Sequence, residues 1–297
     1  MQAVVDIGTN SVRLFIGERT RAVVRDLVIT RLGRGVDRTG VLSEEGTAAT
    51  IQALLRFKQR LDAYNIIPTV VATSAVRDAA NRAQFVEAVR QALGWDVRVL
   101  SGREEAEYSF KGAVMAAAQN ASGPVAVVDI GGGSTEILVG TKAGGLLTGG
   151  SVPVGAVRMT ERHVTAYPIP TDELEALETQ VRAELEELTA AATAAGPTAL
   201  IAVGGTATTL AAVDLKMEEY DPERVTGWKL RVERLQDIYA QLGKLSLAEL
   251  KQVKGLQLGR EDIIAAGTCI LLMSCRLMGF EECTVSDGDL LIGLLTA

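Results

Sequence analysis

The stretch Val4-Val5-Asp6-Ile7-Gly8-Thr9-Asn10-Ser11 has a second copy later in the chain, Val127-Val128-Asp129-Ile130-Gly131-Gly132-Gly133-Ser134-Thr135. In each copy a short apolar strand ends in an aspartate, and a glycine turn with a hydroxyl residue leads into a second apolar strand. A glycine turn between two strands lets the backbone approach a ligand closely and aim its N–H groups at one point. Two such hairpins facing each other would grip a phosphate chain and its metal from both sides.

Length and composition indicate the class of protein. The 297 residues suffice for one large domain or two of moderate size. Because 47% of them are hydrophobic but only 4% aromatic, the core must consist of Ala, Val, Leu and Ile, which favours alternating helices and buried strands. The formal net charge of −7 argues against a general nucleic-acid binder or a membrane-surface protein, since both are usually basic.

The cysteines and the apolar windows indicate a cytoplasmic protein. Cys269, Cys275 and Cys283 have neither zinc-finger nor disulfide spacing, so we expect core thiols in a reducing cytosol. The chain opens without a basic region before an apolar stretch, so a signal peptide is not expected. The most apolar window, residues 263–273, is too short to span a membrane and predicts a buried helix.

The remaining pattern alternates predicted strands and helices. Helix-start signals are Ser43, Pro170 and two Ser-x-x-Glu capping boxes, Ser101 to Glu104 and Ser246 to Glu249. Residues 74–78 are expected to form a strand-to-helix loop. Longer helices are expected over residues 43–64, 81–93, 101–119, 171–195 and 262–278, and a short final one over residues 289–295.

The aspartates that end the two repeated strands are candidate metal ligands. Hard cations such as Mg²⁺ prefer carboxylate oxygens and keep several waters. An aspartate at a turn often only bonds its own backbone, which is the alternative for Asp6 and Asp129. Their occurrence in the same local context twice favours the functional interpretation.

The glycine turns are candidate phosphate loops. Their residues are Gly8, Thr9, Asn10 and Ser11 in the first copy, and Gly131, Gly132, Gly133 and Ser134 in the second. The alternative is two tight hairpins, where glycine is also favoured, although three successive glycines exceed what a hairpin needs. Gly204-Gly205-Thr206 follows a predicted strand and opens a predicted helix, so its N–H groups would also favour an anion.

Two adjacent glutamates have separable roles. The capping box occupies Glu104 with the backbone of Ser101. Glu105 lacks that role and could point into a cleft, where it could act as a general base on a water. The alternative is a solvated glutamate on the helix surface.

Several basic residues could hold an anion. Arg77 follows a buried strand and could clamp a phosphate with its planar guanidinium, although its position also suits an ordinary helix-start arginine. His163 is the sole histidine, which excludes chemistry that needs a histidine pair. Neither a Gly-x-Ser-x-Gly elbow nor a Walker P-loop occurs. Further basic candidates are Arg31, Arg34, Arg38, Arg103, Arg158 and Arg162.

Together, the hairpins and Gly204-Gly205-Thr206 resemble the phosphate-1, phosphate-2 and adenosine motifs of the actin/hexokinase/Hsp70 superfamily. Within it, the chain resembles the exopolyphosphatase/guanosine pentaphosphate phosphohydrolase (Ppx/GppA) family. The resemblance covers nearly the whole chain in order. Besides the hairpins, the matching segments are residues 72–79, 101–106, 154–161 and 285–288.

The resemblance implies an α/β fold of two ribonuclease-H-like domains, as in actin-like ATPases, with the active site in the cleft between them. We expect domains over residues 1–122 and 123–297, divided at the turn-rich segment 120–124, with the last helix as a candidate to dock back on the first domain.

The family's catalytic glutamate falls on Glu105, and its metal- and water-organising aspartate on Asp129, with Asp6 as partner. Its phosphate-holding arginine falls on Arg77. The implied reaction is Mg²⁺-dependent removal of the terminal phosphate from inorganic polyphosphate, or of the γ-type phosphate from pppGpp, with K⁺ as a candidate second cation.

The chain departs from the family at its end. Members often carry an Arg-Glu pair in the final helix, where this chain has Asp289-Leu290-Leu291-Ile292-Gly293. Long members add a C-terminal helical domain that this sequence lacks, which favours short-chain polyphosphate as the substrate.

Three functions stay open: an exopolyphosphatase, a pppGpp phosphohydrolase and a non-catalytic sensor of polyphosphate or (p)ppGpp. Retention of Glu105 argues against the sensor. A sugar or acetate kinase fits the Glu-Glu-Ala and Arg77 contexts less well. The expected partners are phosphate chains or pppGpp, not nucleic acid or membranes, and the sequence leaves a homodimer open.

Overall fold

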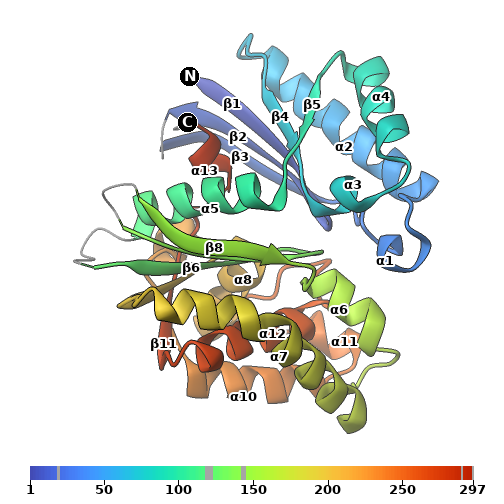
Figure 1. The fold of residues 1–297 in the computed structure, drawn as a ribbon. Helices are drawn as coiled ribbons and strands as arrows, with labels where there is room; N and C mark the ends of the chain where they lie inside the picture. Colours follow the sequence, from blue (N-terminus) through green and yellow to red (C-terminus); the bar gives the residue numbers. More distant parts are fainter. Residues whose placement is uncertain (19–20, 118–122, 142–144, 289, 296–297) are drawn as a thin grey trace.

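The structure is a computed structural model that describes residues 1–297 except 19–20, 118–122, 142–144, 289 and 296–297. It contains two mixed β-sheets, each covered by helices on its outer face, with two helices between the sheets (Figure 1). The predicted α/β class is therefore confirmed. No described helix is both long and apolar enough to cross a membrane.

The first sheet has the strand order β3-β2-β1-β4-β5. The hairpin of β1 and β2 is antiparallel, and β4 and β5 continue the sheet parallel to β1. Cross-strand pairing places Asp6 opposite Arg13, one residue pair away from the turn of the hairpin. The strands are β1 (Gln2–Ile7), β2 (Ser11–Glu18), β3 (Arg21–Ile29), β4 (Thr69–Ala72) and β5 (Val97–Val99).

The second sheet repeats this plan in the order β10-β11-β9-β6-β7-β8. Its hairpin of β6 and β7 is also antiparallel, and β9 lies parallel to β6. Here the register places Asp129 opposite Glu136, where the first sheet has an arginine. The strands are β6 (Val125–Ile130), β7 (Thr135–Gly140), β8 (Leu146–Val152), β9 (Ala199–Val203), β10 (Lys229–Arg231) and β11 (Glu282–Val285).

The outer helices bury the apolar faces of both sheets. In the first half, α2 (Glu44–Asp62) and α4 (Arg82–Leu93) cover one face of the first sheet (Figure 1). In the second half, α7 (Thr171–Ala194), α10 (Val232–Gly243) and α12 (Ile264–Leu277) form the main core with the second sheet. The shorter helices are α1 (Val36–Thr39), α3 (Ser74–Asp78), α6 (Ala156–His163), α8 (Gly204–Asp214), α9 (Pro222–Val225) and α11 (Leu247–Leu250).

The two inner helices are α5 (Gly102–Ala117) and α13 (Leu290–Leu295). Each packs against the sheet of the other half of the sequence. The apolar face of α5, including Phe110, packs against the second sheet. Conversely, α13 packs Ile292 against Val4 and Phe15 of the first sheet. A Cβ on Gly293 would overlap the carbonyl oxygen of Tyr108, so only glycine lets α13 lie this close to α5. The catalytic candidate Glu105 therefore lies on a helix supported by the end of the chain.

The local capping signals correctly predicted where three helices begin. The Ser43 side chain accepts a hydrogen bond from Gly46 N, and both predicted capping boxes form. The three cysteines are free and buried, as expected.

One local prediction was wrong. Residues 74–78 form the helix α3 rather than a loop, because they contain no glycine or proline and Arg77 N bonds the carbonyl of Thr73. The boundary segment 118–122 and Asp289 lie outside the described residues, so the division at residue 122 stays a prediction.

Candidate active site

The two glycine turns face each other in direct contact. The hydroxyl oxygens of Thr9 and Ser74 are 2.9 Å apart, and the second glycine turn lies against both residues. A Cβ on Gly132 would lie 2.7 Å from Thr9 Cβ, and one on Gly133 would lie 2.5 Å from Ser74 Oγ. The close contact between the halves is therefore by itself a reason for glycine at positions 132 and 133.

The helix α6 sets the direction of the peptides in the second turn. Ala156 N donates to the carbonyl of Gly131, and Val157 N donates to that of Gly132, each at 2.9 Å. The third carbonyl, of Gly133, accepts from the side chain of Arg158 (Nε–O 2.7 Å). Across a trans peptide the C=O and the following N–H point in opposite directions. The N–H groups that follow these carbonyls therefore point away from α6.

Most of the predicted site residues line one cavity of about 80 Å³, which we call the inner cavity. It brings together both hairpin turns, the start of α5 and the start of α8. Of the predicted residues, its lining includes Asp6, Gly8, Thr9, Asn10, Ser11, Glu105, Asp129, Gly131, Gly132, Gly204, Gly205 and Thr206.

Three predicted residues lie just outside this lining. Gly133 faces a small hollow beside the inner cavity, and Ser134 is buried near Glu136. Arg77 reaches toward Glu105 from α3.

Glu105 is a buried carboxylate with one charged hydrogen-bond partner. Arg77 Nη1 donates to its Oε2 across 2.8 Å, and the same nitrogen lies 3.2 Å from the carbonyl oxygen of Leu100. Burial raises the pKa of Glu105 to about 7, against the opposing influence of Arg77, and the negative charges of Asp129 and Asp6 add to the increase. A pKa near neutrality suits a group that must accept and return a proton.

Glu104 has the opposite character. Its Oε2 accepts from Ser101 N (2.9 Å), and its other oxygen pairs with Arg98. The backbone bond from Ser101, followed by the bond from Arg98, lowers the pKa of Glu104 to about 2. The capping role predicted for Glu104 is confirmed.

Glu136 is a buried carboxylate beside the candidate site that the sequence reasoning missed. It is buried opposite Asp129 in the hairpin, and Ser151 Oγ donates to its Oε1 at 2.6 Å. Burial raises its pKa well above the usual range, and the charges of Glu105 and Asp129 raise it further. A single carboxylate in an otherwise apolar strand was the signal that could have found it, because buried glutamates are rare unless paired or functional.

The first hairpin is electrostatically different. Arg13 donates to Asp6 Oδ2 through Nε (2.9 Å) and Nη2 (2.6 Å). The two Asp-Ile-Gly copies thus carry different charges at equivalent positions: an ion pair in the first and two carboxylates in the second.

The carboxylates of the site suit a divalent cation. Within the described residues, no group of three or more His, Cys, Asp or Glu side chains is arranged to bind a metal. Mg²⁺, however, usually takes only one or two carboxylates and completes its shell with waters and substrate phosphates. Burial is the main cause of the raised pKa values of Glu105 and Glu136, and neighbouring carboxylates add to both, a charge repulsion that a cation would offset.

Arg260 is a second residue that the sequence reasoning missed. It is almost fully buried and lies against Gly205, where an added Cβ would overlap its guanidinium. Its Nε donates to Gln257 Oε1 at 2.9 Å, and no described carboxylate lies within ion-pair distance. Burial, followed by the nearby charge of Arg13, lowers its pKa to about 10. Two neighbouring arginines in a buried site favour an anionic ligand.

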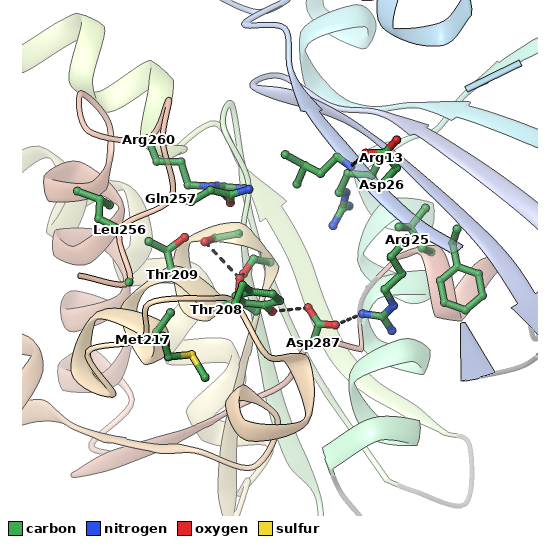
Figure 2. Close-up of a pocket in the computed structure, with 18 of the residues that line it drawn as sticks. Arg13, Arg25, Asp26, Thr208, Thr209, Met217, Leu256, Gln257, Arg260 and Asp287 are labelled. Atoms are coloured by element: carbon green, nitrogen blue, oxygen red, sulfur yellow. Dashed lines mark hydrogen bonds and ion pairs between the residues drawn. The ribbon is translucent and has the colours of Figure 1, made fainter. Parts of the chain in front are cut away.

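A larger cavity of about 380 Å³, the outer cavity, adjoins the inner one and shares Arg13, Arg260 and the Gly204-Gly205 turn with it. Figure 2 shows Arg13, Arg25 and Asp26 on one side and Met217, Leu256 and Arg260 on the other. Asp287 joins the sides, because it pairs with Arg25 and accepts a hydrogen bond from Tyr220 (2.8 Å).

Most of the further basic candidates are engaged in ion pairs. Arg31 pairs with Asp262 of the other half (2.8 Å), and both Arg158 and Arg162 pair with Asp37. Arg103 is exposed and pairs with Glu107 on its own helix. Neither these residues nor His163 lines the inner cavity.

Comparison with known proteins identifies the protein family to which the chain belongs. A family model described as the Ppx/GppA phosphatase family matches residues 4–296, so the chain belongs to that family. It is thereby a phosphatase, a hydrolase of phosphate compounds.

The relatives are similar over nearly all of this chain. Exopolyphosphatase 2 of Mycobacterium tuberculosis is 32% identical over 98% of this chain and 96% of its own length. A guanosine-5'-triphosphate,3'-diphosphate pyrophosphatase of Vibrio atlanticus is 29% identical over 99% of this chain and 58% of its own. The crystal structure of an exopolyphosphatase-like protein superposes with a TM-score of 0.93 at 30% identity, over 99% of this chain and 97% of the other. The predicted two-domain, actin-like fold is confirmed by this similarity.

Proposed function

We propose that the protein is an exopolyphosphatase that releases terminal orthophosphate from short-chain inorganic polyphosphate with the aid of Mg²⁺. The observation that carries this proposal is the buried Glu105, with a pKa of about 7, in one cavity with both glycine turns. A base at that position needs a phosphate-holding surface beside it, and the facing turns supply one.

In the proposed reaction, Glu105 takes a proton from a water in line with the terminal phosphorus. The oxygen of that water bonds to phosphorus, the terminal P–O–P bond breaks on the far side, and the shortened chain leaves with the bridging oxygen. Orthophosphate and a chain one phosphate shorter result.

The residues around Glu105 would stabilise the charge on the reacting phosphate. N–H groups of the turns and the hydroxyl of Thr9 are candidate donors to its oxygens. Asn10 Nδ2 is buried and has no hydrogen-bond partner among the described residues, so it is a further donor for a phosphate oxygen. Arg13 and Arg260 would hold the phosphates that follow.

Asp6 and Asp129 are the proposed ligands of Mg²⁺, with Glu136 beside Asp129 and K⁺ as a candidate second cation. Bound there, the divalent ion would neutralise charge on the phosphate oxygens and on the crowded carboxylates. Asp129 Oδ2 accepts a hydrogen bond from Ser109 Oγ at 2.5 Å, which fixes the carboxylate in place.

The shape of the cavities favours short chains. The inner cavity adjoins the outer one, whose two sides are bridged by the Arg25–Asp287 pair. A few phosphates fit that space, whereas a long polymer would have to pass the bridge.

The outer cavity also supports a second candidate, pppGpp 5'-phosphohydrolase. Its walls include the apolar side chains of Phe15, Leu27, Met217 and Leu256, which suit a nucleoside better than a phosphate polymer. The Vibrio atlanticus relative is named for that kind of substrate.

Phosphate release from tripolyphosphate, long-chain polyphosphate, pppGpp and ATP, with and without Mg²⁺ and K⁺, tests both candidates. Fastest Mg²⁺-dependent release from tripolyphosphate supports the exopolyphosphatase, and fastest release from pppGpp supports the alternative. Release from none would overturn both and favour a binding sensor.

A cavity-filling variant separates the two substrates further. Thr208 lines only the outer cavity. Thr208→Trp should therefore block pppGpp while leaving tripolyphosphate turnover close to that of the wild type.

A further inference from the structure

A continuous chain of charged groups connects Glu105 to the second glycine turn. Arg77 holds Glu105 at 2.8 Å, and its Nε lies 3.7 Å from Asp78 Oδ1. Asp78 Oδ2 in turn accepts from Arg158 Nη2 at 2.7 Å. Arg158 Nε closes the chain on the carbonyl of Gly133 at 2.7 Å.

This series of charged groups passes from the first half of the molecule to the second at Arg158. Asp78 lies in α3, which directly follows β4 of the first sheet, whereas Arg158 lies in α6 beside the second hairpin. Arg158 also pairs with Asp37 of α1, and its side chain is only 12% exposed. One guanidinium therefore contacts two carboxylates of the first half and one carbonyl of the second.

We propose that Arg158 is a positioning residue, which orients the Gly133–Ser134 peptide for phosphate and makes that orientation depend on contact between the two halves. The inference deepens the proposed function and rests on it for the identity of the ligand. The first two carbonyls of the turn are held by backbone N–H groups of α6, but the third is held by this side chain alone among the described contacts. If the guanidinium moves, the third peptide is the one free to rotate.

The chemistry of arginine suits this role. Its planar fork carries five N–H donors, so Nε can bond a carbonyl while both terminal nitrogens bond carboxylates. A lysine at this position could satisfy one or two of these acceptors but not all three in fixed directions. Arg158→Lys should therefore retain the ion pairing and lose most of the peptide orientation.

Arg162, one turn further along α6, provides a matched control. It pairs with Asp37 through Nε and Nη2, as Arg158 does through Nη1, but it has no described contact with the glycine turn. Arg158→Gln and Arg162→Gln each remove one positive charge from α6 and weaken the same contact with Asp37. Only Arg158→Gln also releases the carbonyl of Gly133.

Two measurements test the proposal, with wild type, Arg158→Gln, Arg158→Lys and Arg162→Gln in parallel. The first is kcat and KM for tripolyphosphate. Arg158→Gln should lower kcat about 10- to 100-fold, since loss of one oriented donor costs up to about 10²–10³-fold, and should raise KM less than about fivefold. Arg162→Gln should stay within about twofold of the wild type.

The second measurement is hydrogen–deuterium exchange of the peptide that contains residues 131–134, with and without tripolyphosphate. Tripolyphosphate should slow exchange there in the wild type and Arg162→Gln, and should have little effect in Arg158→Gln. Thermal unfolding of all variants identifies any that fail to fold, and in that case Arg158→Lys carries the comparison.

The outcomes distinguish this inference from the proposed function. If the wild type hydrolyses none of the substrates but shows ligand protection that Arg158→Gln loses, the hydrolase proposal fails and the positioning role stands. If Arg158→Gln and Arg162→Gln match in kcat and in protection, Arg158 only joins the halves and the inference is overturned.

Discussion

Arg77 Nη1 donates a hydrogen bond to Oε2 of Glu105 across 2.8 Å, which joins the helix after the fourth strand to the helix that carries the proposed base. Arg77 opposes the effect of burial on Glu105, so the pKa of about 7 reflects a balance between the two.

Replacing Arg77 should move the pH dependence of activity. Without the guanidinium, the pKa of Glu105 should rise above about 7, because burial and the charges of Asp129 and Asp6 are left unopposed. Since the base acts when deprotonated, the acid limb of kcat/KM against pH should shift to higher pH in Arg77→Met. Arg103→Met is the control, because Arg103 is exposed and pairs only with Glu107 among the described residues. An unchanged acid limb in Arg77→Met would contradict the assignment of the limb to Glu105.

The two adjacent glutamates should differ sharply in activity assays. Glu105→Gln should lower phosphate release by roughly 10²–10⁴-fold, because it removes the base and keeps the shape of the side chain. Glu104→Gln should be much milder, since glutamine also serves at that position of a capping box. Steady-state rates on the best substrate check this, and equal losses in both variants would argue against Glu105 as the base.

The pKa of Glu105 also predicts how stability changes with pH. Its folded pKa of about 7 lies above the ordinary value of 4.5, so its contribution to stability is complete below pH 4.5 and is lost as pH rises through about 7. At pH 8 without Mg²⁺, Glu105→Gln should therefore be more stable than the wild type by up to about 3 kcal/mol, and the difference should disappear near pH 4.5. Urea unfolding at both pH values measures this. A difference that does not depend on pH would mean that Glu105 is not buried in this way.

Glu136 should strengthen the binding of Mg²⁺. Glu136→Gln removes one of the crowded carboxylates beside Asp129 and keeps the hydrogen bond from Ser151 available to the amide oxygen. We expect the Mg²⁺ concentration for half-maximal activity to rise about tenfold or more, by analogy with losses of groups that support a metal ligand. Glu104→Gln, which lies outside the site, should leave it unchanged. Mg²⁺ titrations of the three proteins would contradict the prediction if their midpoints coincided.

The packing of α13 on α5 at Gly293 should contribute to the free energy of unfolding. A methyl group there would overlap the backbone of Tyr108, so Gly293→Ala should separate α13 from α5 and cost about 1–3 kcal/mol. At Gly145 an added Cβ meets nothing within 4 Å, and Gly145→Ala should change stability by no more than about 0.5 kcal/mol. Chemical denaturation compares them. Equal stabilities would mean that α13 does not hold α5 in place.

Much of the local structure could be predicted because its causes lie within a few residues. The glycine hairpins, the cap at Ser43 and the capping box of Ser101 and Glu104 depend on contacts between near neighbours, and each formed as expected. The separation of Glu104 from Glu105 followed from the same local chemistry. The two Asp-Ile-Gly repeats also predicted two facing turns.

The less visible site residues required the tertiary structure. Glu136 and Arg260 carry no motif of their own, and their character comes from burial beside residues distant in sequence. The same holds for Arg158, which was one of several arginines until α6 placed it between Gly133, Asp37 and Asp78.

The sequence by itself determined the two hairpins, the helix caps and the pair of glutamates, because backbone propensity and short-range hydrogen bonding act over a turn or two. Only the tertiary structure decided that α13 packs against the first sheet, that Glu105 is buried against Arg77, and that Glu136 is buried beside Asp129 and Glu105. The physical reason is that burial, and the electrostatic interactions it strengthens, depend on which distant segments share the same low-dielectric space.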